Sequence, residues 1–175
     1  MLVLKVPLDA FDEATQKFVT FDLELEHSLV SLSKWESKFE KPFINTTKTS
    51  EEAAWYLTAM VLNPDVPPEV YRNLTEKHVE EINAYISAKM TATWFAEQPN
   101  QKKGRDVITA ELIYYWMISL NIPYQFETWH INRLLTLIRV CNVKNAPKKK
   151  MTRREALAQQ RTLNEQRRQQ FGNSG

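Results

Sequence analysis

The three histidines are the residues of this chain best suited to catalysis or metal binding, because a neutral imidazole can act as a general base or as a metal ligand. His27, His78 and His130 lie far apart in the sequence, and none belongs to an HExxH or CxxC pattern. His130 lies beside Trp129 and one helical turn from Arg133 and Leu134. We therefore interpret His130 as a buried, hydrogen-bonded histidine of the core, in preference to a ligand.

The cysteine and the adjacent carboxylates lack the partners that a catalytic site needs. Cys141 lies on an apolar stripe with no histidine nearby in the sequence, so a core thiol is favoured over a nucleophile. Glu51-Glu52 and Glu80-Glu81 are neighbours, and neighbouring helical residues point about 100° apart. We interpret them as solvated faces or as partners of helix N-termini. The chain contains no G-x-S-x-G, P-loop or G-x-G-x-x-G pattern, and we expect no enzyme, metal or cofactor.

Charge is distributed very unevenly along the chain. Residues 1–143 carry 14 Lys+Arg and 19 Asp+Glu, a net of −5, whereas residues 144–175 carry nine and two, a net of +7. The acidic part is rich in aromatic residues and the basic part has the pattern of one amphiphilic helix. Such a division is typical of a protein that binds another macromolecule.

The basic tail is the candidate partner-binding segment. Three interpretations of it remain open: a solvated tail that maintains solubility, a site for an acidic protein, and a nucleic-acid contact through phosphates. The only aromatic residue of the tail is Phe171, which provides no stacking platform for bases. The candidate residues are Lys148, Lys149, Lys150, Arg153, Arg154, Leu157, Leu163, Arg167 and Arg168.

Composition favours one helical domain. The chain has 175 residues, of which 43% are apolar, and only three glycines, fewer than hairpin-rich and phosphate-binding folds use. A single cysteine fits a reducing compartment. The first residues do not have the pattern of a signal peptide, and no stretch approaches the roughly 18 apolar residues of a membrane span. We expect a soluble intracellular protein.

Periodicity predicts the elements that position these residues. Residues 2–6 and 18–25 are two β-prone runs that could pair, with an unknown register. Helical spacing begins at Ser28, and Thr49 with Glu52 forms a capping box for the next helix. Pro67-Pro68-Glu69 starts a short helix, and Thr75 caps a helix with a buried stripe of Val79, Ile82, Tyr85 and Ile86.

The second half contains a loop and three further helices. Residues 97–106 form the clearest loop, and Thr109 caps a helix to about residue 120 that is apolar on all sides. We expect this helix and a second one at about 125–143 to be the central pair of the core. The second helix should direct Trp129, Leu134, Leu135, Ile138 and Cys141 inward. Sequence does not decide whether the aromatic stripe Tyr114-Tyr115-Trp116, with Trp129, is core or binding surface.

The predicted fold is mainly α, a single helical domain with a small N-terminal β element and a projecting basic C-terminal helix. Its parts are the β element at 1–26, the helical core at 27–146 and the basic arm at 147–175. The arm has a second capping box at 152–155, which opens a helix to about residue 170, and few apolar anchors. We expect it to contact the core less than any other helix and to become ordered on a partner or a sister subunit.

Five blocks of sequence together resemble a family of small proteins from long-tailed bacteriophages. They are LEHSLVSLSKWE at 25–36, MTAT at 90–93, IYYWMI at 113–118, WHINRLL at 129–135 and NAPKKKM at 145–151. The likeness extends over nearly the whole chain, and the family resembles the tail assembly chaperones encoded near the tape measure gene.

The resemblance implies a function. Such chaperones are helical and non-enzymatic, coat the tape measure protein and recruit tail tube subunits, and many also exist in a frameshifted longer form. They would act in the host bacterial cytoplasm during assembly, and self-association is possible. Two alternatives remain: a structural protein of the head–tail junction or tail, found in the virion, and a nucleic-acid-binding accessory protein.

Overall fold

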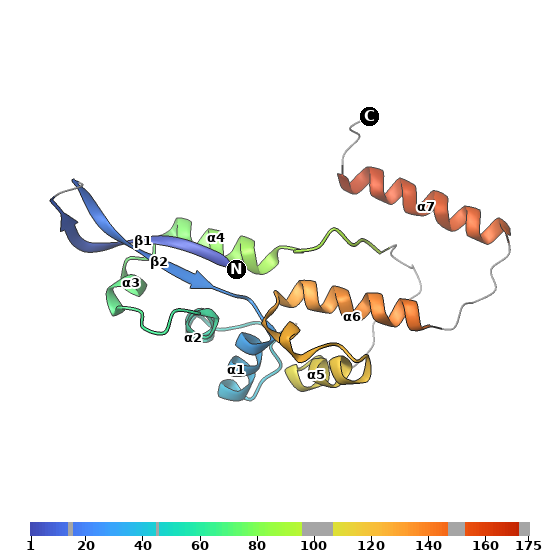
Figure 1. Ribbon diagram of the computed structural model, residues 1–175, viewed down its shortest axis with the longest axis horizontal. Helices are drawn as coiled ribbons and strands as arrows, with labels where there is room; N and C mark the ends of the chain where they lie inside the picture. Colours follow the sequence, from blue (N-terminus) through green and yellow to red (C-terminus); the bar gives the residue numbers. More distant parts are fainter. Residues whose placement is uncertain (14–15, 45, 96–106, 147–152, 172–175) are drawn as a thin grey trace.

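The computed structural model describes residues 1–13, 16–44, 46–95, 107–146 and 153–171 of the chain. Its elements in chain order are β1 (Leu2–Asp12), β2 (Lys17–Leu25), α1 (Leu29–Phe39), α2 (Ser50–Met60), α3 (Pro68–Arg72), α4 (Glu76–Ser87), α5 (Ala110–Ser119), the 3₁₀ helix η1 (Tyr124–Thr128), α6 (Ile131–Asn145) and α7 (Arg153–Phe171). Helices α1 to α6 lie along the β-hairpin and around its inner end, while α7 is set apart (Figure 1). The predicted mainly helical fold is confirmed. The loop predicted at 97–106 lies outside the described residues.

The two strands form an antiparallel hairpin in which Leu2 pairs with Leu25. Alternation along the strands places Leu4, Val6, Leu23 and Leu25 on one face, where all four are buried. The predicted pairing is confirmed, but β1 is longer than the run that was predicted to end at Pro7. The register shifts between Pro7 and Phe11, where proline has no N–H to donate, and pairing then resumes toward the exposed tip.

The inner end of β2 enters the centre of the molecule and is hydrogen-bonded by segments from both halves of the chain. The N–H of Glu26 donates to the carbonyl of Met60 at 2.9 Å, and the N–H of Ile131 donates to the carbonyl of His27 at 2.7 Å. These bonds satisfy the backbone groups that a two-stranded hairpin leaves unpaired at its edges. They also fix where α2 ends and where α6 begins.

The helices predicted as the central pair lie on one side of this core, which corrects that expectation. The centre is formed by the hairpin face and α1, including Trp35, which is fully buried. Trp116 and Leu135 are half-buried and pack against the core, whereas Tyr115 and Ile118 of α5 are 63% and 75% exposed. The apolar composition of α5 predicted burial on all sides, but the hairpin occupies the central position.

Two other details of the helices differ from expectation. The helix predicted at 125–143 is divided into η1 and α6, because His130 is an N-cap whose Nδ1 accepts from the N–H of Asn132 at 3.3 Å. Trp129 and Cys141, predicted to point inward, are half-buried. Val79, predicted to belong to a buried stripe, is 48% exposed.

Polar caps begin most of the helices as the sequence predicted. Thr49 and Glu52 form a reciprocal capping box, with the N–H of Thr49 donating to Glu52 Oε2 at 2.8 Å. Thr75 and Thr109 cap α4 and α5. The capping box predicted at 152–155 begins outside the described residues. None of the described helices is long and apolar enough to span a bilayer.

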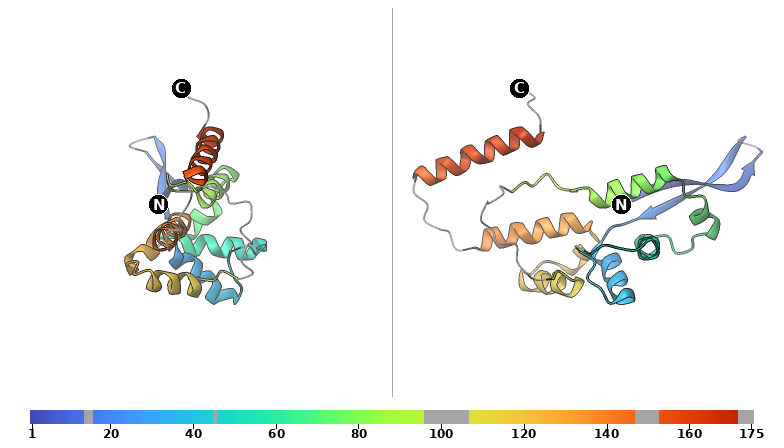
Figure 2. Two further views of the ribbon diagram at one scale, coloured as in Figure 1. Left: turned by 90° about the vertical axis from the view of Figure 1, so that its right-hand side faces the viewer. Right: turned by 180° about the vertical axis from the view of Figure 1, so that it is seen from behind.

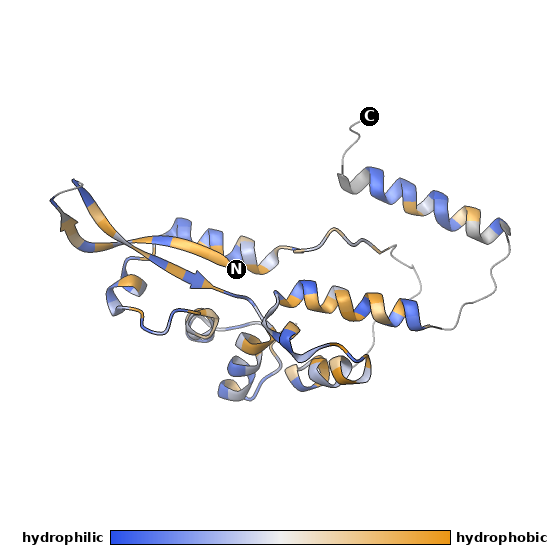
Figure 3. Ribbon diagram, in the orientation of Figure 1, coloured by the Kyte–Doolittle hydropathy of each residue, from blue (hydrophilic) through white to orange (hydrophobic). Residues whose placement is uncertain are grey.

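None of the α7 side chains that the structure describes belongs to the hydrophobic core, whereas each of the other described helices contributes at least one, as predicted for the arm. Hydropathy colouring shows it mostly hydrophilic, in contrast to α6 (Figure 3). It also lies apart from the other helices in the right-hand view of Figure 2, whereas in the left-hand view it overlaps α4.

Candidate protein-binding surfaces

Two of the histidines that are distant in the sequence meet in the core. The rings of His27 and His130 are edge to face with centroids 5.0 Å apart. His27 Nδ1 lies 2.6 Å from the Tyr56 hydroxyl, and His130 Nε2 lies 3.0 Å from the carbonyl oxygen of Tyr85. The interpretation of His130 as a hydrogen-bonded core histidine is confirmed. Its pairing with His27 depends on the tertiary fold and was not predicted.

Burial keeps this cluster uncharged at neutral pH. Desolvation lowers the pKa of His27 to about 3, with smaller contributions from His130 and Lys48. Burial likewise lowers the pKa of His130 and raises the pKa of Tyr56 and of Tyr85. Both imidazoles are 4% exposed. The geometry therefore supports packing and hydrogen bonding in the core more than contact with a substrate.

No group of three or more His, Cys, Asp or Glu side chains in the described part of the chain is placed to hold a metal ion. Cys141 is a free, half-buried thiol on α6.

The structure places the predicted arm residues as follows. Lys148, Lys149 and Lys150 lie outside the described residues, and Arg153 is the first residue of α7. Arg154, Leu157, Arg167 and Arg168 are exposed, and Leu163 is half-buried. Leu157 is 51% exposed, which is unusual for a leucine that packs on its own body.

The basic surface extends beyond the arm, which the count along the chain did not reveal. Residues 88–95 and 131–146 contain four Lys+Arg and no Asp or Glu. On α6, Arg133 stacks on Trp129 with its guanidinium 3.8 Å from the ring centroid, and Arg139 lies 4.1 Å from the ring centroid of Phe95. The net charge of residues 1–143 is negative, so the sum over that range did not reveal that α6 carries basic residues and no acidic ones.

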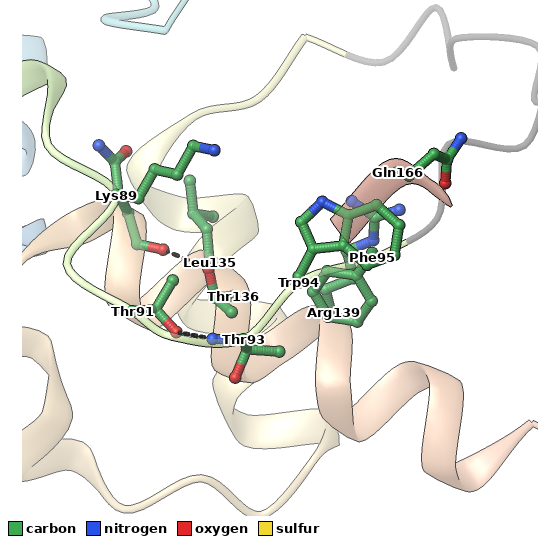
Figure 4. A pocket seen from close by; sticks show the side chains of 10 residues that line it. Lys89, Thr91, Thr93, Trp94, Phe95, Leu135, Thr136, Arg139 and Gln166 are labelled. Atoms are coloured by element: carbon green, nitrogen blue, oxygen red, sulfur yellow. Dashed lines mark hydrogen bonds between the residues drawn. The ribbon is translucent and has the colours of Figure 1, made fainter. Parts of the chain in front are cut away.

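A cavity of about 650 Å³ lies between the 88–95 segment, α6 and α7. Its lining includes Trp94, Phe95 and Arg139, with Gln166 of α7 beside them and Lys89 at the far side (Figure 4). The Thr93 N–H donates to Thr91 Oγ1 at 3.0 Å and shapes the loop. Aromatic rings beside cationic side chains suit an anionic or π-bearing ligand.

A second cavity, of about 750 Å³, is an apolar groove between α2, α3 and α4. The lining residues are Phe43, Lys48, Ala53, Ala54, Tyr56, Leu57, Thr58, Met60, Tyr71, Leu74, Val79, Ile82, Asn83 and Ile86. Val79, expected in the core, lines this groove. We call it the α2–α4 groove.

The outer side of α5 forms an exposed apolar surface. Tyr115 and Ile118 are three residues apart and lie on one face of the helix. Tyr114 is adjacent to Tyr115 in the sequence, and its ring stacks on that of Tyr124 with the ring centroids 5.8 Å apart. Tyr124 is 66% exposed, and the Tyr114 hydroxyl donates to Glu127 Oε2 at 2.8 Å. We call Tyr114, Tyr115, Ile118 and Tyr124 the α5 patch. The aromatic stripe that the sequence left undecided is thus divided between core packing and surface.

Comparison of the chain with protein-family models, with curated proteins and with solved structures finds no significant match.

Proposed function

We propose that this protein is a non-enzymatic tail assembly chaperone of a long-tailed bacteriophage, which holds the tape measure protein and tail tube subunits in the host cytoplasm before assembly. The resemblance of the five sequence blocks supports the proposal. The structural observation that carries it is the α5 patch. A helix that is apolar on all sides is ordinarily enclosed by protein, yet this one exposes two of its large apolar residues.

The chemistry of the α5 patch suits an apolar helical client. The resemblance implies a client that is a long helix with apolar stripes, which would aggregate if left bare. Tyrosine is enriched at interface hot spots because its ring buries a large area and its hydroxyl remains hydrogen-bonded. Glu111 and Glu127, the acidic residues nearest the patch in the sequence, favour solubility of the unbound protein.

Co-expression with the tape measure protein tests the proposal. The wild-type chain should keep the tape measure in the soluble fraction, and a variant carrying Tyr115→Ser and Ile118→Ser should fail to do so. A matched control carries Leu62→Ser and Val143→Ser, which remove apolar groups that are 51% and 59% exposed elsewhere. Equal insolubility with and without the wild-type chain would contradict the proposal.

The structural virion protein is the first alternative, and mass spectrometry of purified virions separates it from a chaperone. A chaperone leaves the particle and is absent from mature virions. A structural component is present in stoichiometric amount.

A nucleic-acid-binding accessory protein is the second candidate, and one observation favours it. Trp94 and Phe95 lie beside Arg139 in the cavity that α7 also lines, so a basic surface with aromatic rings exists where the tail alone offered none. This function requires binding to single-stranded DNA that weakens steeply with salt. Titration of labelled oligonucleotides at several salt concentrations tests it.

A further inference from the structure

The α2–α4 groove has an acidic rim around an apolar floor. Residues 48–87 carry seven Asp+Glu and three Lys+Arg, a net of −4. Lys48 is the one cation among the lining residues, and its ammonium donates to the carbonyls of Phe43 and Thr46 at 2.7 and 3.1 Å. Two of its three donors are therefore engaged by backbone carbonyls, and no other cationic residue of the described chain lines the groove.

Helical geometry places three glutamates on that rim. On α4, Glu76 comes three positions before the lining residue Val79, and Glu80 comes three positions before the lining residue Asn83. Residues three apart are neighbours on a helix surface, so these glutamates border the lining residues. On α2, Glu51 precedes the lining residue Ala54 by three positions. All three glutamates are exposed, and none forms an ion pair with another described residue.

Helix α7 has the complementary pattern. Residues 153–171 carry five Arg and two Glu, a net of +3. At 100° per residue, its apolar positions 156, 157, 163 and 171 fall within about a third of the helix circumference. Arg154, Arg161 and Arg168, spaced seven residues apart, form a row beside this apolar arc. The helix thus offers an apolar stripe bordered by cations to a groove with an apolar floor bordered by anions.

The contact of α7 with its own body is polar and poorly satisfied. Gln166 lines the cavity beside Trp94 and Arg139, and its Oε1 is buried without a hydrogen-bond partner among the described residues. A buried acceptor without a donor is unfavourable. Leu157 meanwhile remains 51% exposed. Leu163 is only half-buried, so a single copy leaves both leucines of the α7 stripe incompletely covered.

We propose that α7 of one copy binds in the α2–α4 groove of a second copy, with Arg161 and Arg168 facing Glu76 and Glu80. This contact differs from the α5 patch and does not rest on the client proposed for it. Each copy carries one arm and one groove, so the contact is head-to-tail and generates open chains or closed rings. The attraction across the rim is between exposed charges and weakens with salt.

Charge reversal on each side tests the proposal in the full-length protein. The groove variant carries Glu76→Lys and Glu80→Lys, and the arm variant carries Arg161→Glu and Arg168→Glu. Sedimentation velocity over a range of concentrations should show self-association of the wild-type chain, reduced at high salt. Each variant alone should associate at least about 100-fold more weakly, because like charges then face each other.

Mixing the two variants tests whether the arm of one copy meets the groove of another. In the mixture the native arm can bind the native groove and the reversed arm can bind the reversed groove, so association should return although each variant alone associates weakly. A chain with all four substitutions should regain self-association. The control carries Glu13→Lys and Glu81→Lys, which make the same charge change at two exposed residues away from the groove, and should associate like the wild type.

A wild-type chain that remains monomeric at every concentration would overturn the proposal. Undiminished association of either variant, or a mixture that associates no more strongly than the variants alone, would overturn it as well. Circular dichroism of each variant checks that helical content is retained, so that a loss of association reports on the contact and not on unfolding.

Discussion

The imidazole rings of His27 and His130 lie edge to face with their centroids 5.0 Å apart, and both are 4% exposed. One follows the end of β2 and the other is the N-cap of α6, so the pair joins the end of the N-terminal hairpin to the last helix of the core. Two positive charges at this distance would repel each other, and burial already disfavours each of them. The core therefore requires both rings to be neutral.

Stability should fall as the pH is lowered. An ordinary histidine titrates near 6.5, whereas His27 in the folded protein has a pKa of about 3. Between these values the unfolded chain binds a proton that the folded protein does not, so the free energy of unfolding decreases as pH falls from 6.5 toward 3. His27 alone should remove about 2 kcal/mol between pH 7.5 and pH 5. Urea unfolding at the two pH values measures this, and His27→Gln should flatten the dependence. Equal stability at both pH values would show that the pair is not held neutral.

Replacement of Glu36 by alanine should destabilise the protein by about 3 kcal/mol. Its carboxylate is buried and accepts from the N–H groups of Phe43 and Ala110, each at 2.7 Å, so its loss leaves two buried donors without an acceptor. Glu81→Ala is the control, since Glu81 is exposed and its only described ion pair, with Lys77, spans 4.0 Å. Thermal and urea unfolding report the difference. A change below about 1 kcal/mol would contradict this role of Glu36.

Replacement of Glu40 by glycine should stabilise the protein by about 0.5 kcal/mol. Glu40 ends α1 in the left-handed region with φ of 52°, where a Cβ atom is unfavourable and glycine is preferred. Glu40→Ala retains the Cβ atom and should give no such gain, which makes it the matched control. The midpoints of urea unfolding measure both, and equal values for the two variants would refute the explanation.

Deletion of residues 148–175 should leave the body folded, because none of the described α7 side chains belongs to the hydrophobic core. The melting temperature should change by less than about 3 °C, since little apolar surface of the body is uncovered. The same deletion should abolish self-association and weaken partner binding. A large fall in melting temperature would show that the arm is part of the core.

The features that the sequence predicted correctly are those set by interactions between residues close together in the chain. Capping residues such as Thr49 and Thr75 act within four residues, so their helices were located correctly. The alternation of apolar and acidic residues from Phe21 to Leu25 likewise predicted a strand with one apolar face. The basic, anchor-poor composition of residues 153–171 was enough to predict a helix outside the core.

The way these elements pack against one another depends on contacts between residues far apart in the sequence, which the spacing of residue types does not predict. The apolar α5 has the same pattern whether its second face is covered by the body or by a partner, so its exposed side was missed. The α2–α4 groove is lined by residues of α2, α4 and the segment around α3, and Val79, expected in the core, is one of them. The meeting of His27 with His130 required the pairing of distant backbone segments.

Site-specific photocross-linking in cells tests the central claim most directly. A photoreactive amino acid replaces Ile118 in the α5 patch, and a control chain carries it at Val143, which is also exposed. Both chains are co-expressed with the tape measure protein, and cross-linked products are identified by mass spectrometry. The account predicts that position 118 forms a covalent product with the tape measure and that position 143 does not. Absence of a tape measure product from position 118, in a chain that is folded and expressed at the wild-type level, would contradict it.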